Sequence, residues 1–260
     1  MPLTTVSLLL RSAASGRCLR CGVVSENDEL YCDKCGPTRT TVSLTANHKT
    51  AIKDTVRVVR DARADIEQDE RACYRIKRWL AGLISRGDES LEAVLHTYIY
   101  VFWSTLRFPD TFAPPNREGT GKVYFTSESL PEAVEYSATE EAKFIASLKR
   151  QARVDLVAVD HEVQAIYLLE VKKGGLDDRA VGQLLRYYEH WSKALHRSEC
   201  RMLNLNYIRP LVVLESLQDS EWRSLPQFFR DVVGIYRYKI DTDGITMSLL
   251  NTRRQMMSPF

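Results

Sequence analysis

Apolar residues are grouped into two short runs in the middle of the chain, between Val154 and Val171. Two apolar runs, Val154 to Val159 and Ala165 to Val171, are rich in Val, Ile, Leu and Tyr and are separated by a polar segment. Runs of this length and composition predict β-strands. Because apolar residues occupy both faces of these runs, we expect two central strands that are covered on both sides.

The short polar segment predicts a hairpin, and the hairpin fixes which residues lie opposite each other. A four-residue loop would pair Asp160 with Ala165. Counting back along both strands then sets Asp155 opposite Glu170. Side chains alternate between faces, so Glu170 and Lys172 share one face. The sequence therefore predicts two carboxylates and an ammonium together at the end of two apolar strands.

These charges indicate a metal site. A lone carboxylate in a covered sheet is costly, and a divalent cation would remove that cost. Mg²⁺ takes oxygen ligands, typically one or two carboxylates together with water and substrate phosphate. We expect Asp155 and Glu170 to bind Mg²⁺ or Mn²⁺, and Lys172 to orient or activate the attacking water. A surface ion-pair cluster of the same three residues remains the alternative from spacing alone.

The order Asp155, fourteen residues, then Glu170, Val171 and Lys172 resembles the motif of the PD-(D/E)xK, or restriction-endonuclease-like, nuclease superfamily. The resemblance implies an α/β (α+β) fold with a mixed sheet flanked by helices. It also implies a metal-dependent phosphodiesterase in which the carbonyl of Val171 helps to bind the metal.

A predicted helix after this motif narrows the resemblance. It carries Gln183 and Tyr187 one turn apart on one face. The pair fits the QxxxY motif of RecB-like nucleases, and VGQLLRY is similar to the corresponding helix of NucS-type DNA endonucleases. The resemblance, which covers roughly residues 144–191, implies that both side chains position the scissile phosphate. Arg179 or Arg186 could contact the phosphate backbone.

A second metal signal lies near the start of the chain. Cys18, Cys21, Cys32 and Cys35 form two Cys-x-x-Cys-Gly knuckles separated by ten residues. Four thiolates at this spacing predict a closed structural Zn²⁺ site and resemble a zinc ribbon. Disulfides are the alternative, which we disfavour because we expect no secretory signal. The ribbon would grip nucleic acid or a protein partner, or simply pack against the rest of the chain.

We expect three parts: a zinc ribbon in residues 1–45, a helical region in residues 46–110 and a nuclease domain in residues 111–260. In the resembled families, a helix ahead of the first strand often presents one more acidic residue to the metal. We favour Glu92 for this role. Its rivals are Glu132, Glu135, Glu140 and Glu141.

The remaining pattern predicts elements around this centre. In chain order these are a flexible or strand-forming lead (1–17), one long or two serial helices (47–83), and an apolar helix (89–106) capped by Asp88. They continue with strands at 122–126 and 143–149, a helix capped by Asp177 or Asp178 and ending near Leu195, and a strand at 211–214. Last come a helix from Asp219 to about Val232 and a hairpin of IYRYKI with ITMSLL.

Composition changes this picture little. With 44% hydrophobic and 27% charged residues, the chain is typical of a soluble globular protein, and no apolar run is long enough for a membrane span. The net charge of +2 neither requires nor excludes nucleic acid, so a binding face must be a local basic patch. The five histidines show no metal-ligand spacing, and Cys73 and Cys200 stand alone.

Together these patterns predict a Mg²⁺-dependent DNA endonuclease in repair, recombination or defence, located in the cytoplasm, nucleoid or nucleus. The alternatives are a catalytically inactive nucleic-acid-binding or partner-recruited protein of the same fold, and an RNA endonuclease. The ribbon or the charged helices could dock a protein partner or a second copy of the chain.

Overall fold

The computed structural model describes residues 5–18, 21, 23–24, 30, 46–85, 91–103, 106, 121–125, 144–145, 154–161, 164–196, 201–241 and 244–250. The chain divides into two compact units. The helical unit comprises Met1–Phe102 with Ile240–Ile245, and the sheet unit comprises Trp103–Lys239 with Thr246–Phe260.

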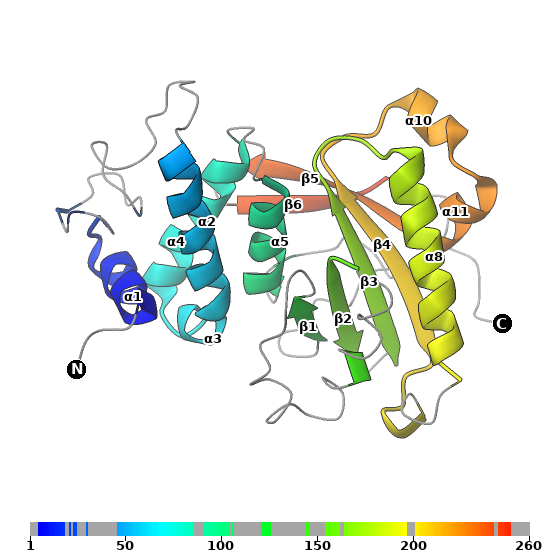
Figure 1. Ribbon diagram of the computed structural model, residues 1–260, viewed down its shortest axis with the longest axis horizontal. Helices are drawn as coiled ribbons and strands as arrows, with labels where there is room; N and C mark the ends of the chain where they lie inside the picture. The colour runs from blue at the N-terminus through cyan, green and yellow to red at the C-terminus, as the bar shows by residue number, and fades with distance from the viewer. Residues whose placement is uncertain are drawn as a thin grey trace. The chain divides into compact units, whose positions relative to one another are not determined.

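The helical unit is built mainly from helices, of which α2 and α4 are amphipathic and α5 is largely apolar (Figure 1). They are α1 (Thr5–Ser15), α2 (Ala46–Asp61), α3 (Arg63–Ile66), α4 (Glu70–Ser85) and α5 (Leu91–Val101). The prediction of serial helices after residue 46 is confirmed. α4 begins at Glu70 because the Asp69 carboxylate accepts a hydrogen bond from Ala72 N at 2.9 Å, which caps the helix. α5 ends at Val101, earlier than the predicted Leu106, and Asp88 lies outside the described residues.

α1 overturns one prediction. The start of the chain was expected to be flexible or a strand, whereas Thr5–Ser15 is helical and buries Leu9 and Ala13, which lie one turn apart. The helix ends in a Schellman motif: Gly16 has a φ of 71°, and Arg17 N donates to Ser12 O at 3.0 Å. The short apolar run could be a strand or a helix by pattern alone, and this C-terminal glycine is the signal that decides it.

A buried arginine holds the end of α1. Arg75 on α4 is 0% exposed, and its Nη1 donates to the carbonyls of Ser12 and Ala13, at 2.7 Å each. These carbonyls belong to the last turn of α1, where the helix dipole also favours a cation. The buried charge is thus paired with the negative end of a neighbouring helix.

The helical unit also contains the tip of a β-hairpin. Ile245 N donates to the Tyr98 hydroxyl at 2.9 Å. Gly244 has a φ of 134°, and a Cβ built there would meet the Tyr98 hydroxyl and the Lys77 side chain. Only glycine fits this position, because it combines a left-handed conformation with two close neighbours.

The sheet unit is organised around a six-stranded sheet with strands in sequence order, β1-β2-β3-β4-β5-β6. These strands are β1 (Gly121–Phe125), β2 (Leu156–Asp160), β3 (Ala165–Lys172), β4 (Tyr207–Leu214), β5 (Gly234–Asp241) and β6 (Gly244–Leu249). β1, β2 and β3 pair antiparallel, whereas β3, β4 and β5 pair parallel. The expected mixed sheet is confirmed, and so is the hairpin register, with Asp160 paired to Ala165 and Leu156 to Leu169.

α8 (Asp178–Ala194) connects the parallel strands β3 and β4 and packs on them (Figure 1). Asp177 caps it by accepting from Ala180 N at 2.7 Å, as predicted. Leu184 packs with Val212 and Leu214 of β4, and Trp191 packs with Val157 of β2 and Leu168 of β3. β2 and β3 are buried along their length, apart from partly exposed Lys172, as expected of central strands.

Two further predictions are corrected. The helix expected from Asp219 to Val232 is split into α10 (Asp219–Ser224) and α11 (Gln227–Val232), because Pro226 forces Leu225 into an extended conformation. The N-cap is Gln218, which forms a capping box with Glu221. In the strand expected at 143–149, Phe144 and Ile145 are helical, and residues 143 and 146–149 lie outside the described part. The strand that pairs with β2 on this side is β1.

Among the described helices, none is long and apolar enough to cross a membrane. This result agrees with the absence of a long apolar run in the sequence.

The Arg75 contact predicts a change in stability. We expect Arg75→Met to lower the free energy of unfolding by about 2 kcal/mol, because two hydrogen bonds from a charged donor are lost from a buried site. Urea unfolding measures this change. Arg78→Met is the matched control on the same helix, since Arg78 makes only an exposed contact with Tyr74, and it should change stability by less than about 0.5 kcal/mol. Equal effects of the two substitutions would contradict the role given to Arg75.

Candidate functional site

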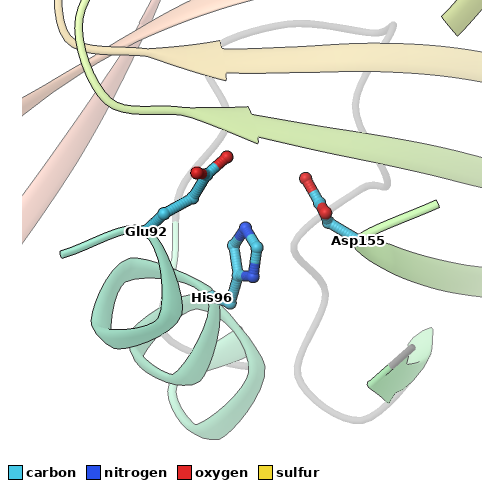
Figure 2. Close-up of side chains that lie close together, drawn as sticks. All are labelled: Glu92, His96 and Asp155. Carbon is cyan, nitrogen blue, oxygen red and sulfur yellow. The ribbon is translucent and has the colours of Figure 1, made fainter. Parts of the chain in front are cut away.

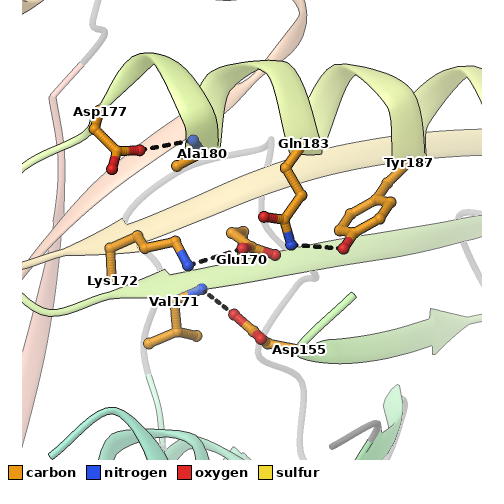
Figure 3. A network of polar contacts seen from close by, with 8 residues as sticks. All are labelled: Asp155, Glu170, Val171, Lys172, Asp177, Ala180, Gln183 and Tyr187. Atoms are coloured by element: carbon orange, nitrogen blue, oxygen red, sulfur yellow. Dashed lines mark hydrogen bonds and ion pairs between the residues drawn. The ribbon is translucent and has the colours of Figure 1, made fainter. Parts of the chain in front are cut away.

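The sheet unit places the three residues of the predicted catalytic motif at neighbouring strand ends (Figure 3). Glu170 and Lys172 lie at the end of β3. Asp155 immediately precedes β2. Leu156 pairs with Leu169, so one residue further along each strand Asp155 lies across from Glu170. The expected meeting of these side chains therefore follows from the hairpin register.

Glu170 and Lys172 form an ion pair. Lys172 Nζ lies 2.9 Å from Glu170 Oε1. Glu170 pairs with Val212 of β4, and Lys172 pairs with Leu214. Both partners pack against α8, so Glu170 and Lys172 lie on the helix-covered face of the sheet, and the predicted common face is confirmed. Glu170 is only 1% exposed, so its carboxylate is shielded from water and needs positive charge close to it.

Asp155 is held against the neighbouring strand through its side chain. Its Oδ2 accepts a hydrogen bond from Val171 N at 2.8 Å (Figure 3). In an extended strand the N–H and C=O of one residue point to the same edge, so the Val171 carbonyl also points toward Asp155. A carboxylate offers about four lone-pair positions, so this bond is compatible with metal binding by Asp155.

α8 adds two polar side chains to the same place. Gln183 Nε2 donates to the Tyr187 hydroxyl at 2.5 Å, one turn away (Figure 3). Burial raises the pKa of Tyr187, the Gln183 hydrogen bond and Lys172 oppose the rise, and the negative charges of Glu170 and Asp155 add to it. The phenol therefore keeps its proton at neutral pH, and its O–H can serve as a hydrogen-bond donor. The charges of Glu170, Asp155 and Lys172 therefore all act on the Tyr187 hydroxyl.

This group offers the ligands that a hard divalent cation prefers. Two carboxylates and a carbonyl supply oxygen atoms, and the burial of Glu170 creates a need for positive charge. Mg²⁺ or Mn²⁺ therefore fits the residues present. The chemistry that such a set can perform is hydrolysis of a phosphate ester by a positioned water.

The turn that joins Lys172 to α8 is fixed from outside the motif. The Gly174 carbonyl accepts hydrogen bonds from Glu215 N and Ser216 N, at 3.3 and 3.4 Å. A Cβ built on Gly175 would lie 2.6 Å from Glu221 Oε1. Glu221 is itself held, because its Oε2 accepts from Gln218 N at 2.7 Å. Sequence reasoning missed Glu221, which lies far from the motif along the chain.

In the helical unit, α5 carries a second pair of potential metal ligands. Glu92 and His96 lie one turn apart and point from the same side of the helix (Figure 2). A carboxylate oxygen of Glu92 and a ring nitrogen of His96 lie within 4.8 Å of each other, and His96 is buried. The sequence carried this signal as Glu-x-x-x-His, and the expectation that no histidine has metal-ligand spacing is wrong for His96.

Glu92 belongs to the helical unit and Asp155 to the sheet unit, so the expectation that Glu92 joins the metal of Asp155 stays a prediction. The rival acidic residues Glu132, Glu135, Glu140 and Glu141 lie outside the described residues.

The first cysteine knuckle is partly described. Arg17 pairs with Val24 in an antiparallel bridge, and Cys18 N donates to Val23 O at 2.8 Å, so the chain reverses tightly around Cys21. Cys18 is buried and Cys21 is exposed. A hairpin of this kind is compatible with a zinc knuckle. Cys32 and Cys35 lie outside the described residues, as does Cys200, while burial raises the pKa of Cys73 on α4.

Comparison of the chain with models of protein families, with curated proteins and with solved structures finds no match. Function therefore has to be inferred from the site, because fold alone does not determine chemistry.

The Gly175 contact predicts a rescue. We expect Gly175→Ala to lower the free energy of unfolding by about 1–2 kcal/mol, since the new methyl group would collide with the Glu221 carboxylate. Adding Glu221→Ala removes the obstacle, so the double variant should be more stable than the sum of the single effects predicts. Chemical unfolding of all four proteins gives the coupling energy. Strict additivity would contradict the contact.

Proposed function

We propose that this chain is a Mg²⁺- or Mn²⁺-dependent nuclease of the PD-(D/E)xK type that hydrolyses phosphodiester bonds, with DNA as its favoured substrate. The observation that carries the proposal is the buried Glu170 carboxylate, which forms an ion pair with Lys172. The register of the hairpin places Asp155 across from it on the neighbouring strand. Gln183 and Tyr187 from α8 complete the group. A purely structural ion pair would not require these further polar side chains.

Each residue has a distinct role in this proposal. Asp155 and Glu170 hold the metal, together with the Val171 carbonyl. When bound, the ion polarises the phosphate and lowers the pKa of a water molecule. The Lys172 ammonium orients that water and offsets negative charge on the phosphate. Tyr187 donates a hydrogen bond from its phenol to a phosphate oxygen, while the amide of Gln183 fixes the orientation of the phenol.

Exposed arginines on α8 would extend the contact with the substrate. Arg179 and Arg186 are exposed two turns apart on the helix that carries Gln183. The Arg186 guanidinium lies over Gly182, with Nη1 3.5 Å from the position of a Cβ there. Both are suited to contact backbone phosphates, which contribute affinity without sequence preference. A role in repair, recombination or defence agrees equally with such contacts.

The N-terminal cysteines form a structural zinc site in this proposal. Cys18 and Cys21 are the described ligands, and Cys32 and Cys35 complete the set by their sequence spacing. The ribbon would serve as a second contact for nucleic acid or for a protein partner.

A cleavage assay tests the nuclease proposal. Linear, circular, branched and mismatched DNA and RNA would be incubated with Mg²⁺, Mn²⁺ or EDTA. We expect metal-dependent cleavage of DNA. Asp155→Asn, Glu170→Gln and Lys172→Met should each lower the rate by about two orders of magnitude or more, because each removes a metal ligand or the charge that positions the water.

Exposed residues close to the site provide matched controls. Asp178→Asn and Lys173→Met make the same chemical changes outside the proposed site and should retain cleavage. Preferential cutting of RNA would change the substrate class. If all of these proteins bound nucleic acid without cleaving it, the chain would instead be a catalytically inactive binding protein or a subunit that needs a partner.

Zinc content tests the ribbon separately. Native mass spectrometry of the full chain should show one zinc ion, and Cys18→Ser or Cys21→Ser should weaken its retention against a competing chelator. Cys73→Ser is the control, since this cysteine lies on α4 apart from the knuckle. Equal retention in all variants would contradict the assignment of the ligands.

A further inference from the structure

The pair formed by Lys172 and Glu170 has a consequence for metal binding. The ammonium lies 2.9 Å from Glu170 Oε1, while the carboxylate is 1% exposed and the Lys172 side chain is 26% exposed. Water can therefore solvate part of the lysine but almost none of the carboxylate. In this arrangement Lys172 is a counter-charge that makes ionised Glu170 tolerable inside the protein.

A divalent cation would need the same carboxylate. If the ion binds to Glu170 while Lys172 stays in contact, two positive charges share one anion at short range, which is strongly unfavourable where water is excluded. The partly exposed lysine has a long flexible side chain and can move, whereas Glu170 is fixed on a buried strand.

We propose that Lys172 and the metal ion compete for the Glu170 carboxylate, so that metal binding displaces the lysine ammonium from Glu170. This inference rests on the proposed metal site and goes beyond it by making Lys172 a built-in restraint on metal affinity. The displaced ammonium is then available to the attacking water and the phosphate. The restraint delays assembly of the catalytic group until a cation has bound.

The competition predicts that a substitution that abolishes cleavage will raise the affinity for the metal. Lys172→Met removes the competitor and leaves Glu170 in need of a cation, so Mn²⁺ should bind about tenfold more tightly, even though cleavage is lost. Lys172→Arg keeps the positive charge and should bind Mn²⁺ within about twofold of the unsubstituted chain. Lys173→Met, at the exposed neighbouring position, should leave the affinity unchanged.

Titration calorimetry or electron paramagnetic resonance of the full chain with Mn²⁺ alone measures these affinities without using activity. If Lys172→Met bound Mn²⁺ no more tightly than the unsubstituted chain, the competition would be overturned while the metal site would stand. Binding of no Mn²⁺ by the unsubstituted chain would overturn both. These two failures are therefore distinguishable.

A second measurement does not depend on the stability of the methionine variant. Reductive methylation with ¹³C labels the lysines and keeps their charge. The Lys172 signal, assigned by its loss in Lys172→Arg, should shift on addition of Mg²⁺ and stay unshifted when Mg²⁺ is added to Glu170→Gln. A Lys172 signal that does not respond to saturating Mg²⁺ would overturn the proposal.

Discussion

The buried carboxylate of Glu170 is the constraint on which the arrangement of this site depends. β3 is otherwise an apolar strand, covered along its length, and a negative charge near its end has to be compensated. Lys172 provides one positive charge from the same face of the same strand. Asp155 adds a second negative charge, which one ammonium cannot balance. A site with both carboxylates therefore favours a divalent cation.

The local chain supplies nearly everything else that this carboxylate needs. One hairpin brings Asp155 and Glu170 to adjacent strand ends, and one turn leads from Lys172 to the helix of Gln183 and Tyr187. Position 175 in this turn has no room for a side chain, because the Glu221 carboxylate lies against Gly175. The same helix packs on the sheet through Leu184 and carries the hydrogen-bonded pair of Gln183 and Tyr187.

Local patterns predicted the sheet unit well, because its features depend on neighbours in sequence. The four-residue loop predicted the register of β2 and β3, and Asp177 was one of the two residues predicted to cap α8. α1 was missed because a short apolar run suits a helix and a strand equally. The break before α11 has a local signal in Pro226, which ends the helix that the apolar periodicity alone would continue.

Features that depend on distant residues could not be predicted in this way. The contact of Arg75 with the end of α1 and that of Glu221 with Gly175 join segments far apart in sequence, and neither has a local signature. Glu92 was predicted as a metal ligand, and its spacing of one helical turn from His96 is the local signal that would have added the histidine.

Anomalous diffraction from a crystal of the full chain grown with Mn²⁺ tests the central claim most directly. The account predicts an anomalous peak within coordination distance of carboxylate oxygens of both Asp155 and Glu170. A well-ordered site without such a peak at saturating Mn²⁺, or a peak that touches neither carboxylate, would contradict it.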